Sequence, residues 1–501
     1  MAPQGFRYRL TMPTIKHDGP REIEDERNPG ASGPCGARNR GCLPYFAVAE
    51  GIRIARQIAE YQNETDAELA CMREKHGGLA AADRPVGGKA PIAPLHDLSP
   101  SPRVPVGQDR LRNLAWIPAL VAAAVICVSL YGNRARYSRA DFRQYYSWWS
   151  EFRAGVDPWL PEASPEQVTR GGIGFCDWTP AYVTFLSPFA LLPQRAAYWL
   201  WQGLQLAALL ASLVMLLREM RPRPHSTITV LAIALALLYP PVHATLHGAQ
   251  TAFLLLLTLT ASWLLARRSR PAAAGLTLAL ATVLKAFPGA VGGYFLFRRR
   301  FDVLGWAILF AVLSIIGTGV GHWREWILYG TPMTTGDFDQ LRMVSVLSNV
   351  YHFLHQAFPA AGQGQLLLPA FSVTLLIDLL VLAFAGCVSR WMPDYNNSDG
   401  LYFGIWLGVA LLLSPASWDH ELPLLLPIYL FAGAGFLESR PSYRVAAGIM
   451  AAAVAVVALA AVVMPFRPLH PYFLATLSTV AAAGLALRPT AAQPIQTAPA
   501  R

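Results

Sequence analysis

The chain has 501 residues, of which 54% are hydrophobic and only 14% are charged. This composition excludes a water-soluble α/β fold and a secreted disulfide scaffold, and it predicts an all-α polytopic membrane protein. The net charge of +10 does not by itself indicate a nucleic-acid partner, because arginines in short loops set membrane orientation. The six cysteines form no CxxC pair and no cluster with histidine at metal-binding spacing.

The first 112 residues are rich in proline, glycine and charge and contain no signal-peptide pattern. We expect 1–112 to be a cytoplasmic, largely disordered tail, in which 45–75 could form one amphipathic helix. A second disordered tail is expected at 489–501. The transmembrane domain would then be 113–488.

Apolar stretches of membrane-spanning length alternate with short polar loops from Leu114 onward. We expect about ten full spans, near 114–132, 195–217, 227–242, 249–267, 303–320, 366–388, 401–417, 421–438, 443–464 and 471–487. The arginine-bearing turns should be cytoplasmic by the positive-inside rule. These turns carry Arg218, Arg221 and Arg223; Arg267, Arg268 and Arg270; Arg298, Arg299 and Arg300; Arg390; Arg440 and Arg444; and Arg488.

One apolar stretch, 272–297, has arginines at both ends, so a single crossing would place one cluster on the wrong side. A short re-entrant helical hairpin resolves this conflict, with its outer turn at Lys285 and a new helix opened by Pro288. One long tilted span is the alternative.

With this hairpin, the loops 133–194 and 321–365 lie on the outer face. The same face collects seven histidines, namely His243, His247, His322, His352, His355, His420 and His470. A transporter would more often spread ionisable groups along a path near the bilayer midplane.

The first outer loop is rich in tyrosine and tryptophan between Asp141 and Trp159, which is typical of a helix lying in the headgroup layer. An interfacial anchor would not explain the carboxylate of Asp141, just beyond the first span. It would also not explain why six arginines lie on the outer side, against the positive-inside rule. Binding of a phosphate group would explain them. These are Arg134, Arg136, Arg139, Arg143, Arg153 and Arg170.

Several motifs follow one another between about 114 and 487. They are Asp141…Tyr145…Gly155-Val-Asp157-Pro158-Trp159, Trp178-Thr-Pro180-Ala-Tyr182 leading to Leu-Leu-Pro193, His247-Gly-Ala-Gln250-Thr251, Ala274-Gly275…Lys285-Ala-Phe-Pro288…Arg298-Arg299-Arg300, and Leu-Ser414-Pro415-Ala-Ser-Trp418-Asp-His420. In this order the chain resembles glycosyltransferase family 87 (DUF2029), the GT-C-type mannosyltransferases that depend on polyprenyl-phosphate mannose. The family commonly has Gly-Gln-Asn at the third motif and an aromatic residue where this chain has Glu421.

The resemblance implies a membrane enzyme that moves a hexose, with mannose expected, from a polyprenyl-phosphate sugar to an acceptor on the outer or periplasmic face. Inverting transfer needs one general base and cations for the departing phosphate. We assign the base to Asp141, with a structural role as the alternative and Asp157, Asp177 or Glu151 as substitutes.

Lys285 is the only lysine after Lys89, and an ammonium inside an apolar run is costly. We assign it to the donor phosphate, together with Arg139, Arg143 and Arg153; a lysine that snorkels to the interface is the alternative. The matching motifs imply a set of substrate-binding residues: Tyr145, Trp178, His247, Gln250, Trp418 and His420. For Trp418 and His420, interface anchoring fits equally well.

The pairs Asp337-Phe-Asp339 and His352-x-x-His355 are weak metal signals, so no metal and no cofactor is expected. The expected partners are the lipid bilayer, the polyprenyl-phosphate sugar donor and an acceptor that could be a glycan, lipid or protein, with no nucleic acid. The expected location is the inner cell membrane, with a cytoplasmic N-terminus. A secondary transporter or lipid flippase is the alternative function, although only 272–297 looks interrupted and no repeat is evident.

Overall fold

The computed structural model describes residues 116–132, 141–159, 176, 178–220, 226–330, 343–359, 361, 363–391, 397–415, 417–437, 441–462 and 471–487. Over these residues the protein is helical, as predicted, and the β-type contact that is found is an isolated bridge between Met343 and Trp418. The predicted tails 1–112 and 489–501 lie outside the described residues.

The first half of the chain contains α3 (Trp116–Gly132), α4 (Asp141–Arg153), α6 (Pro180–Leu186), η2 (Ser187–Leu191), α7 (Gln194–Glu219), α8 (Ser226–Leu238), α9 (Pro240–Gly248), α10 (Ala252–Arg267), α11 (Pro271–Leu284), η3 (Phe287–Val291) and α12 (Gly292–Phe297). The second half contains α13 (Phe301–Gly317), α14 (Val320–Glu325), η4 (Trp326–Gly330), α16 (Val346–Ala357), α17 (Gln363–Trp391), α18 (Ser398–Leu413), η6 (Asp419–Leu425), α19 (Leu426–Leu437), α20 (Pro441–Val462) and α21 (Pro471–Ala486).

The described helices differ from the expected spans mainly in length. Two of them, α7 and α17, are long and apolar enough to cross a membrane. Two further pairs would qualify if each is one broken span: α8 with α9, bent by 55°, and α13 with the helix after it, bent by 101°. The expectation of about ten full spans is therefore not confirmed, because most of the other apolar helices have only 10–17 residues.

The interior is formed by helices that are apolar on all sides. Every described residue of α18 from Gly400 to Leu412 is buried, as expected for a helix surrounded by others. α11 packs closely against α10 and α13. At Gly275 a Cβ atom would lie 2.5 Å from Cβ of Trp306 and 2.7 Å from the backbone nitrogen of Ala307, so only glycine allows this approach.

The stretch 272–297 is interrupted at the predicted turn. α11 ends at Leu284, Lys285 has an extended backbone, and η3 begins two residues later. The two arginine-bearing ends of the stretch meet at one carboxylate, because Asp399 lies 3.7 Å from Nε of Arg267 and 3.3 Å from Nη2 of Arg298. This geometry is that of a hairpin with both ends on one side.

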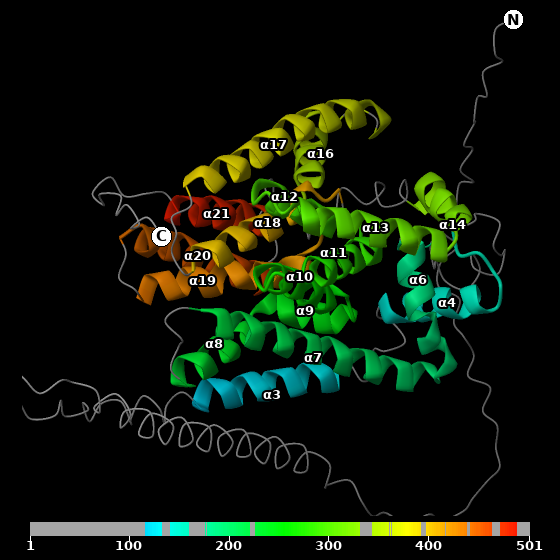
Figure 1. Ribbon diagram of the computed structural model, residues 1–501, viewed down its shortest axis with the longest axis horizontal. Helices are drawn as coiled ribbons and strands as arrows, with labels where there is room; N and C mark the ends of the chain where they lie inside the picture. Colours follow the sequence, from blue (N-terminus) through cyan, green and yellow to red (C-terminus); the bar gives the residue numbers. More distant parts are fainter. Residues whose placement is uncertain are drawn as a thin grey trace, which may run out of the picture. The chain divides into compact units, whose positions relative to one another are not determined.

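Figure 1 shows α4, α6 and α14 close together at one end of the described helices. α4 contacts α6, and α13, which leads into α14, also contacts α6. α4 begins with Asp141, α14 carries His322, and α6 contacts α11, which ends just before Lys285. The N-terminal end of α6 is tied to that point, since Oγ1 of Thr179 donates to the carbonyl of Leu284 at 3.2 Å.

Candidate active site

Asp141 is the first residue of α4 and is exposed. Its Oδ2 accepts a hydrogen bond from Nε2 of Gln250, although 109 residues separate the two in the chain. Gly248 lies beside this pair, where a Cβ atom would be 3.3 Å from Oδ2 of Asp141. The structure thus brings together the first and third sequence motifs.

The turn that presents Gln250 is firmly held. α9 ends at Gly248, and Ala249 adopts a left-handed conformation with φ of 52°. Nε1 of Trp201 donates to the carbonyl of Ala249 at 2.7 Å, and Nε2 of Gln202 donates to that of Leu246 at 2.7 Å. Two buried side chains of α7 therefore set the direction in which Gln250 leaves α9.

An aromatic cluster connects α4 to Lys285. Tyr145 lies one turn after Asp141, is buried, and packs in a T-shaped arrangement with Trp178, with 5.2 Å between ring centroids. Trp178 stacks on Tyr182 at 4.1 Å. The ammonium of Lys285 lies 4.8 Å from the centroid of the Trp178 ring, which is within the range of a cation–π interaction.

Lys285 also forms an ion pair with Glu421. The side chain of Glu421 is 1% exposed and that of Lys285 is 21% exposed, so the pair is largely removed from water. The other oxygen of Glu421 accepts from the backbone nitrogen of Trp418 at 3.4 Å. The lone lysine of the apolar region is therefore not a snorkelling side chain without a partner.

A further hydrogen bond closes these contacts into a ring. Oγ1 of Thr245, on α9, donates to the backbone carbonyl of His420 at 2.5 Å. We call the resulting arrangement the contact ring. In order it consists of Asp141, Tyr145, Trp178, Lys285, Glu421, His420, Thr245 and Gln250. Side-chain contacts join Tyr145 to Trp178, Trp178 to Lys285, Lys285 to Glu421, His420 to Thr245 and Gln250 to Asp141, and the remaining neighbours lie within five residues of each other in the chain.

The other predicted substrate-binding residues lie beside the contact ring. His247 is exposed at the end of α9, and the Trp418 ring is stacked on that of His420 with 6.2 Å between centroids. Arg143 and Arg153 are exposed on α4, and Arg143 does not share the face of Asp141, because residues two apart on a helix diverge. Predicted phosphate ligand Arg139 lies outside the described residues.

Of the substitutes for the base, Glu151 accepts a hydrogen bond from Ser147 on its own helix at 2.9 Å, and Asp177 is outside the described residues. The weak metal pair at 337 and 339 is also outside them. In the second weak pair, Nε2 of His352 lies 2.7 Å from Nε2 of Gln356.

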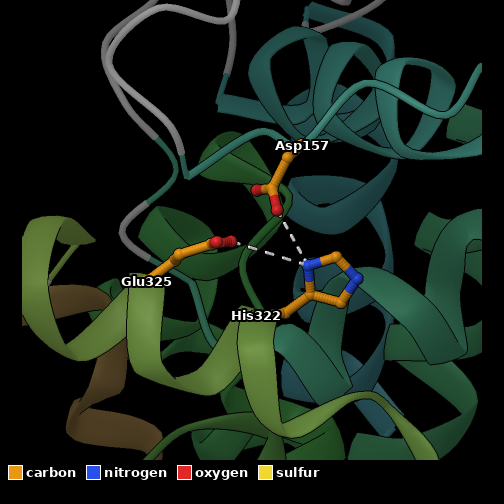
Figure 2. A group of neighbouring side chains, drawn as sticks. All are labelled: Asp157, His322 and Glu325. Carbon is orange, nitrogen blue, oxygen red and sulfur yellow. Dashed lines mark hydrogen bonds and ion pairs between the residues drawn. The ribbon is translucent and has the colours of Figure 1, made fainter.

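Asp157, the remaining substitute, belongs to a separate cluster with His322 and Glu325 of α14. Figure 2 shows both carboxylates directed at Nδ1 of the imidazole, at 2.8 Å from Oδ2 of Asp157 and 3.8 Å from Oε2 of Glu325. The pKa of Glu325 is raised, first because its protonated form can hydrogen-bond to Asp157 and then by burial and by the charge of Asp157.

The roles of Glu421 and Glu325 were missed by reasoning from the sequence. From the sequence, Glu421 was noted only because the family commonly has an aromatic residue at that position. The signal that could have revealed its role is that one acid and one lysine lie in apolar segments expected at the same membrane border. No pattern in the sequence could pair Asp157 with Glu325, because more than 160 residues separate them and the backbone turns by 101° just before α14.

Residues 178–415 match the model of glycosyltransferase family 87. The predicted resemblance to this family is confirmed. Two proteins from Mycolicibacterium smegmatis (strain ATCC 700084 / mc(2)155) are similar to the chain at low identity.

The first relative is a polyprenol-phosphate-mannose-dependent alpha-(1-2)-phosphatidylinositol pentamannoside mannosyltransferase, 26% identical over 272 residues. The second is a polyprenol-phosphate-mannose-dependent alpha-(1-2)-phosphatidylinositol mannoside mannosyltransferase, 25% identical over 280 residues. Each match covers 52% of this chain and 61% or 62% of the relative. The segment that matches family 87 contains Trp178, His247, Gln250 and Lys285, whereas Asp141 precedes it and Trp418 follows it.

Proposed function

We propose that the protein is a membrane mannosyltransferase that takes the sugar from a polyprenyl phosphate and transfers it with inversion to an acceptor. The observation that carries this proposal is the contact ring. It joins two carboxylates, an ammonium group and aromatic rings from five separate segments. Six of its members stand in the motifs that resemble family 87, namely Asp141, Tyr145, Trp178, Gln250, Lys285 and His420. The names of the two relatives support the donor class.

Asp141 acts in this proposal as the general base. Its carboxylate is exposed, so an acceptor hydroxyl can reach it. The hydrogen bond from Gln250 goes to Oδ2 of this carboxylate and holds it in place. A single base is sufficient, because the acceptor hydroxyl attacks the sugar directly and the departing phosphate needs no protonation at neutral pH. The base therefore takes one proton while the sugar–phosphate bond breaks.

Lys285 acts as the cation that receives the donor phosphate. Its ammonium has three N–H donors, of which one serves Glu421, so two remain for phosphate oxygens. Glu421 provides an opposite charge for the lysine in a largely buried place before the donor arrives. The ring of Trp178 offers an apolar face next to the ammonium, suited to the sugar or to the first isoprene units.

The proposed orientation places the N-terminus in the cytoplasm and the contact ring at the outer or periplasmic border of the inner membrane. α11 runs from the arginine-rich end to Lys285, and its 14 residues span about 21 Å. Arginines at one end and the site at the other support a re-entrant hairpin for 272–297 under the positive-inside rule.

The relatives act on phosphatidylinositol mannosides, which supports a glycolipid as the acceptor class here. A direct test uses the full chain in membranes with polyprenyl-phosphate mannose labelled in the sugar. We expect label to move into an organic-extractable glycolipid and the polyprenyl phosphate to be released in equal amount. Movement of intact labelled donor across sealed vesicles without sugar release would instead indicate a flippase.

A further inference from the structure

The cluster of Asp157, His322 and Glu325 has the spacing of a metal-binding site. One ligand atom from each residue can be chosen so that all three lie within 4.8 Å of one another. Nδ1 of His322 lies 2.8 Å from one carboxylate oxygen and 3.8 Å from the other. Ligands of a four-coordinate ion with bonds of about 2.0–2.1 Å are roughly 3.3 Å apart, midway between these two distances.

The charges of the cluster favour a bound cation. Two carboxylates point at one imidazole nitrogen, which can donate a single hydrogen to only one of them at a time (Figure 2). Oε2 of Glu325 is buried and accepts no hydrogen bond from any described residue. A buried carboxylate oxygen beside a second carboxylate is costly unless a proton or a cation lies between them.

The surrounding residues hold two of the three ligands in place. Oδ1 of Asp157 accepts from the backbone nitrogen of Trp159 at 3.0 Å, which leaves Oδ2 directed at His322. The rings of Phe152 and Trp159 lie 5.7 and 5.4 Å from the imidazole. His322 and Glu325 are three residues apart on α14 and so share a helix face. This support resembles the outer contacts that orient metal ligands in proteins.

We propose that Asp157, His322 and Glu325 bind one divalent transition-metal ion, of the Mn²⁺ or Zn²⁺ class, which joins the segment after α4 to α14. One imidazole with two carboxylates suits these ions better than Mg²⁺, which prefers oxygen ligands alone. The site goes beyond the proposed transferase activity and takes no part in its chemistry.

The bound ion would brace the candidate active site through Trp159. Nε1 of Trp159 donates to the backbone carbonyl of Trp178 at 2.9 Å, and Trp178 carries the cation–π contact with Lys285. A metal ion that holds Asp157 in place would therefore also hold the neighbouring Trp159, and through it Trp178 of the contact ring. The three ligands are positioning residues in this arrangement.

The test uses the full-length protein purified in detergent, stripped with a chelator and titrated with Mn²⁺, with the loss of the free-Mn²⁺ electron paramagnetic resonance signal as the readout. We expect one saturable site per chain and displacement of Mn²⁺ by Zn²⁺. Glu325→Gln and His322→Asn should each weaken binding by at least about tenfold. Asp302→Asn, which alters an exposed carboxylate on neighbouring α13, is the matched control and should bind as the wild type does.

Thermal unfolding supplies a second readout that does not depend on activity. Added Mn²⁺ should raise the midpoint of the wild type and of Asp302→Asn, and it should leave both ligand variants unchanged. Absence of a stoichiometric site in the wild type, or equal affinity in Glu325→Gln, would overturn the proposal in favour of a hydrogen-bonded triad. Either result can be told apart from a failure of the proposed transferase activity, because that activity is tested by sugar transfer in the wild type and in variants of Asp141 and Lys285.

Discussion

At the scale of single residues, Asp141 and Lys285 each have a polar partner from a distant part of the chain. Gln250 donates a hydrogen bond to Asp141, and Glu421 forms an ion pair with Lys285. The two partners have different consequences for mutagenesis. Loss of the exposed Asp141 charge leaves a neutral amide that can stay hydrogen-bonded, whereas loss of the Lys285 charge leaves a buried carboxylate unpaired.

The first prediction concerns Asp141→Asn. The amide keeps the shape of the side chain but cannot accept the proton of the acceptor hydroxyl, so transfer should fall by about 10²–10⁴-fold. Sugar transfer from labelled donor measures this, and protein abundance in membranes should match that of Asp302→Asn. Transfer within tenfold of wild type would remove Asp141 from the role of base.

The second prediction concerns Lys285. If the ammonium binds the donor phosphate, Lys285→Met should lower donor use by on the order of 10–100-fold, the equivalent of a charge-assisted contact of roughly 1.5–3 kcal/mol. Lys285→Arg should keep part of the activity, because a planar guanidinium does not reproduce a compact ammonium. Initial rates at limiting donor concentration provide the measurement.

The double variant Lys285→Met with Glu421→Gln controls for the ion pair. It removes the unpaired carboxylate and should recover thermal stability that Lys285→Met loses, because a broken buried pair costs about 3–5 kcal/mol. Donor use should stay low in the double variant. If donor use recovers together with stability, Lys285 has a structural role and the phosphate assignment is wrong.

At the scale of helices, hydropathy predicted where apolar helices occur but not where they break. The stretch expected as one span near 227–242 becomes α8 and α9, which meet at Tyr239 with a bend of 55°. Pro240 begins α9 at a position where its missing N–H costs nothing. The interruption at Lys285 was predicted, because arginines at both ends of 272–297 are incompatible with a single crossing under the positive-inside rule. The bend at Tyr239 has no such charge pattern around it.

The third prediction tests the close packing of α11 on α13. Gly275→Ala places a Cβ atom 2.5 Å from Cβ of Trp306, so overpacking should cost about 1–3 kcal/mol, partly offset by the better helix propensity of alanine. The matched control is Gly305→Ala on α13, where a Cβ atom meets nothing within 4 Å. The thermal midpoint in detergent should fall for the first variant and stay equal or rise for the second. Equal midpoints would show that the helices separate easily at this point.

The candidate site was predictable to the extent that each residue carries its own signal. Asp141, Trp178, Gln250 and Lys285 stand in motifs or in unusual surroundings, and each is now part of the contact ring. The ion pair between Lys285 and Glu421 was not predicted, because 136 residues of chain separate the two. Such contacts depend on how helices pack, and local sequence patterns hold no information about it.

At the scale of the whole described structure, the hairpin of 272–297 has several arginines at its open end and a single lysine at its turn. The arginine end includes Arg267, Arg298 and their shared partner Asp399, and the other end leads to Lys285 in the contact ring. In the proposed orientation, the positive-inside rule places the arginine end in the cytoplasm and the turn at Lys285 at the outer border.

The fourth prediction tests this orientation by cysteine labelling in a cysteine-free background. Ala154→Cys lies in an exposed position after α4, and Ser269→Cys lies in the exposed turn between α10 and α11. An impermeant maleimide should label the first in intact cells and the second only after lysis. Native Cys176 is buried and would not serve as the outer probe.

Labelling of Ser269→Cys in intact cells, without lysis, would place the arginine end outside and would reverse the orientation. A cysteine at 285 that reacts only from the cytoplasmic side would remove the re-entrant turn. Both variants need the same lysis control, in which all exposed positions become reactive.

The carboxylate of Asp399 has a consequence for the order of assembly during synthesis. It accepts hydrogen bonds from Trp263 and Tyr294 and pairs with two arginines, and 105 residues separate it from Tyr294 in the chain. At roughly 5–20 residues per second, the ribosome needs about 5–20 s to add that length. For that interval Arg267 already has Glu219 at 3.3 Å and Arg300 already donates to the carbonyl of Ala266 at 2.8 Å, whereas Arg298 has no carboxylate from Asp399. We therefore expect the hairpin to form before α18 emerges and to gain its last ion pair only then, so that truncation before 398 lowers its stability.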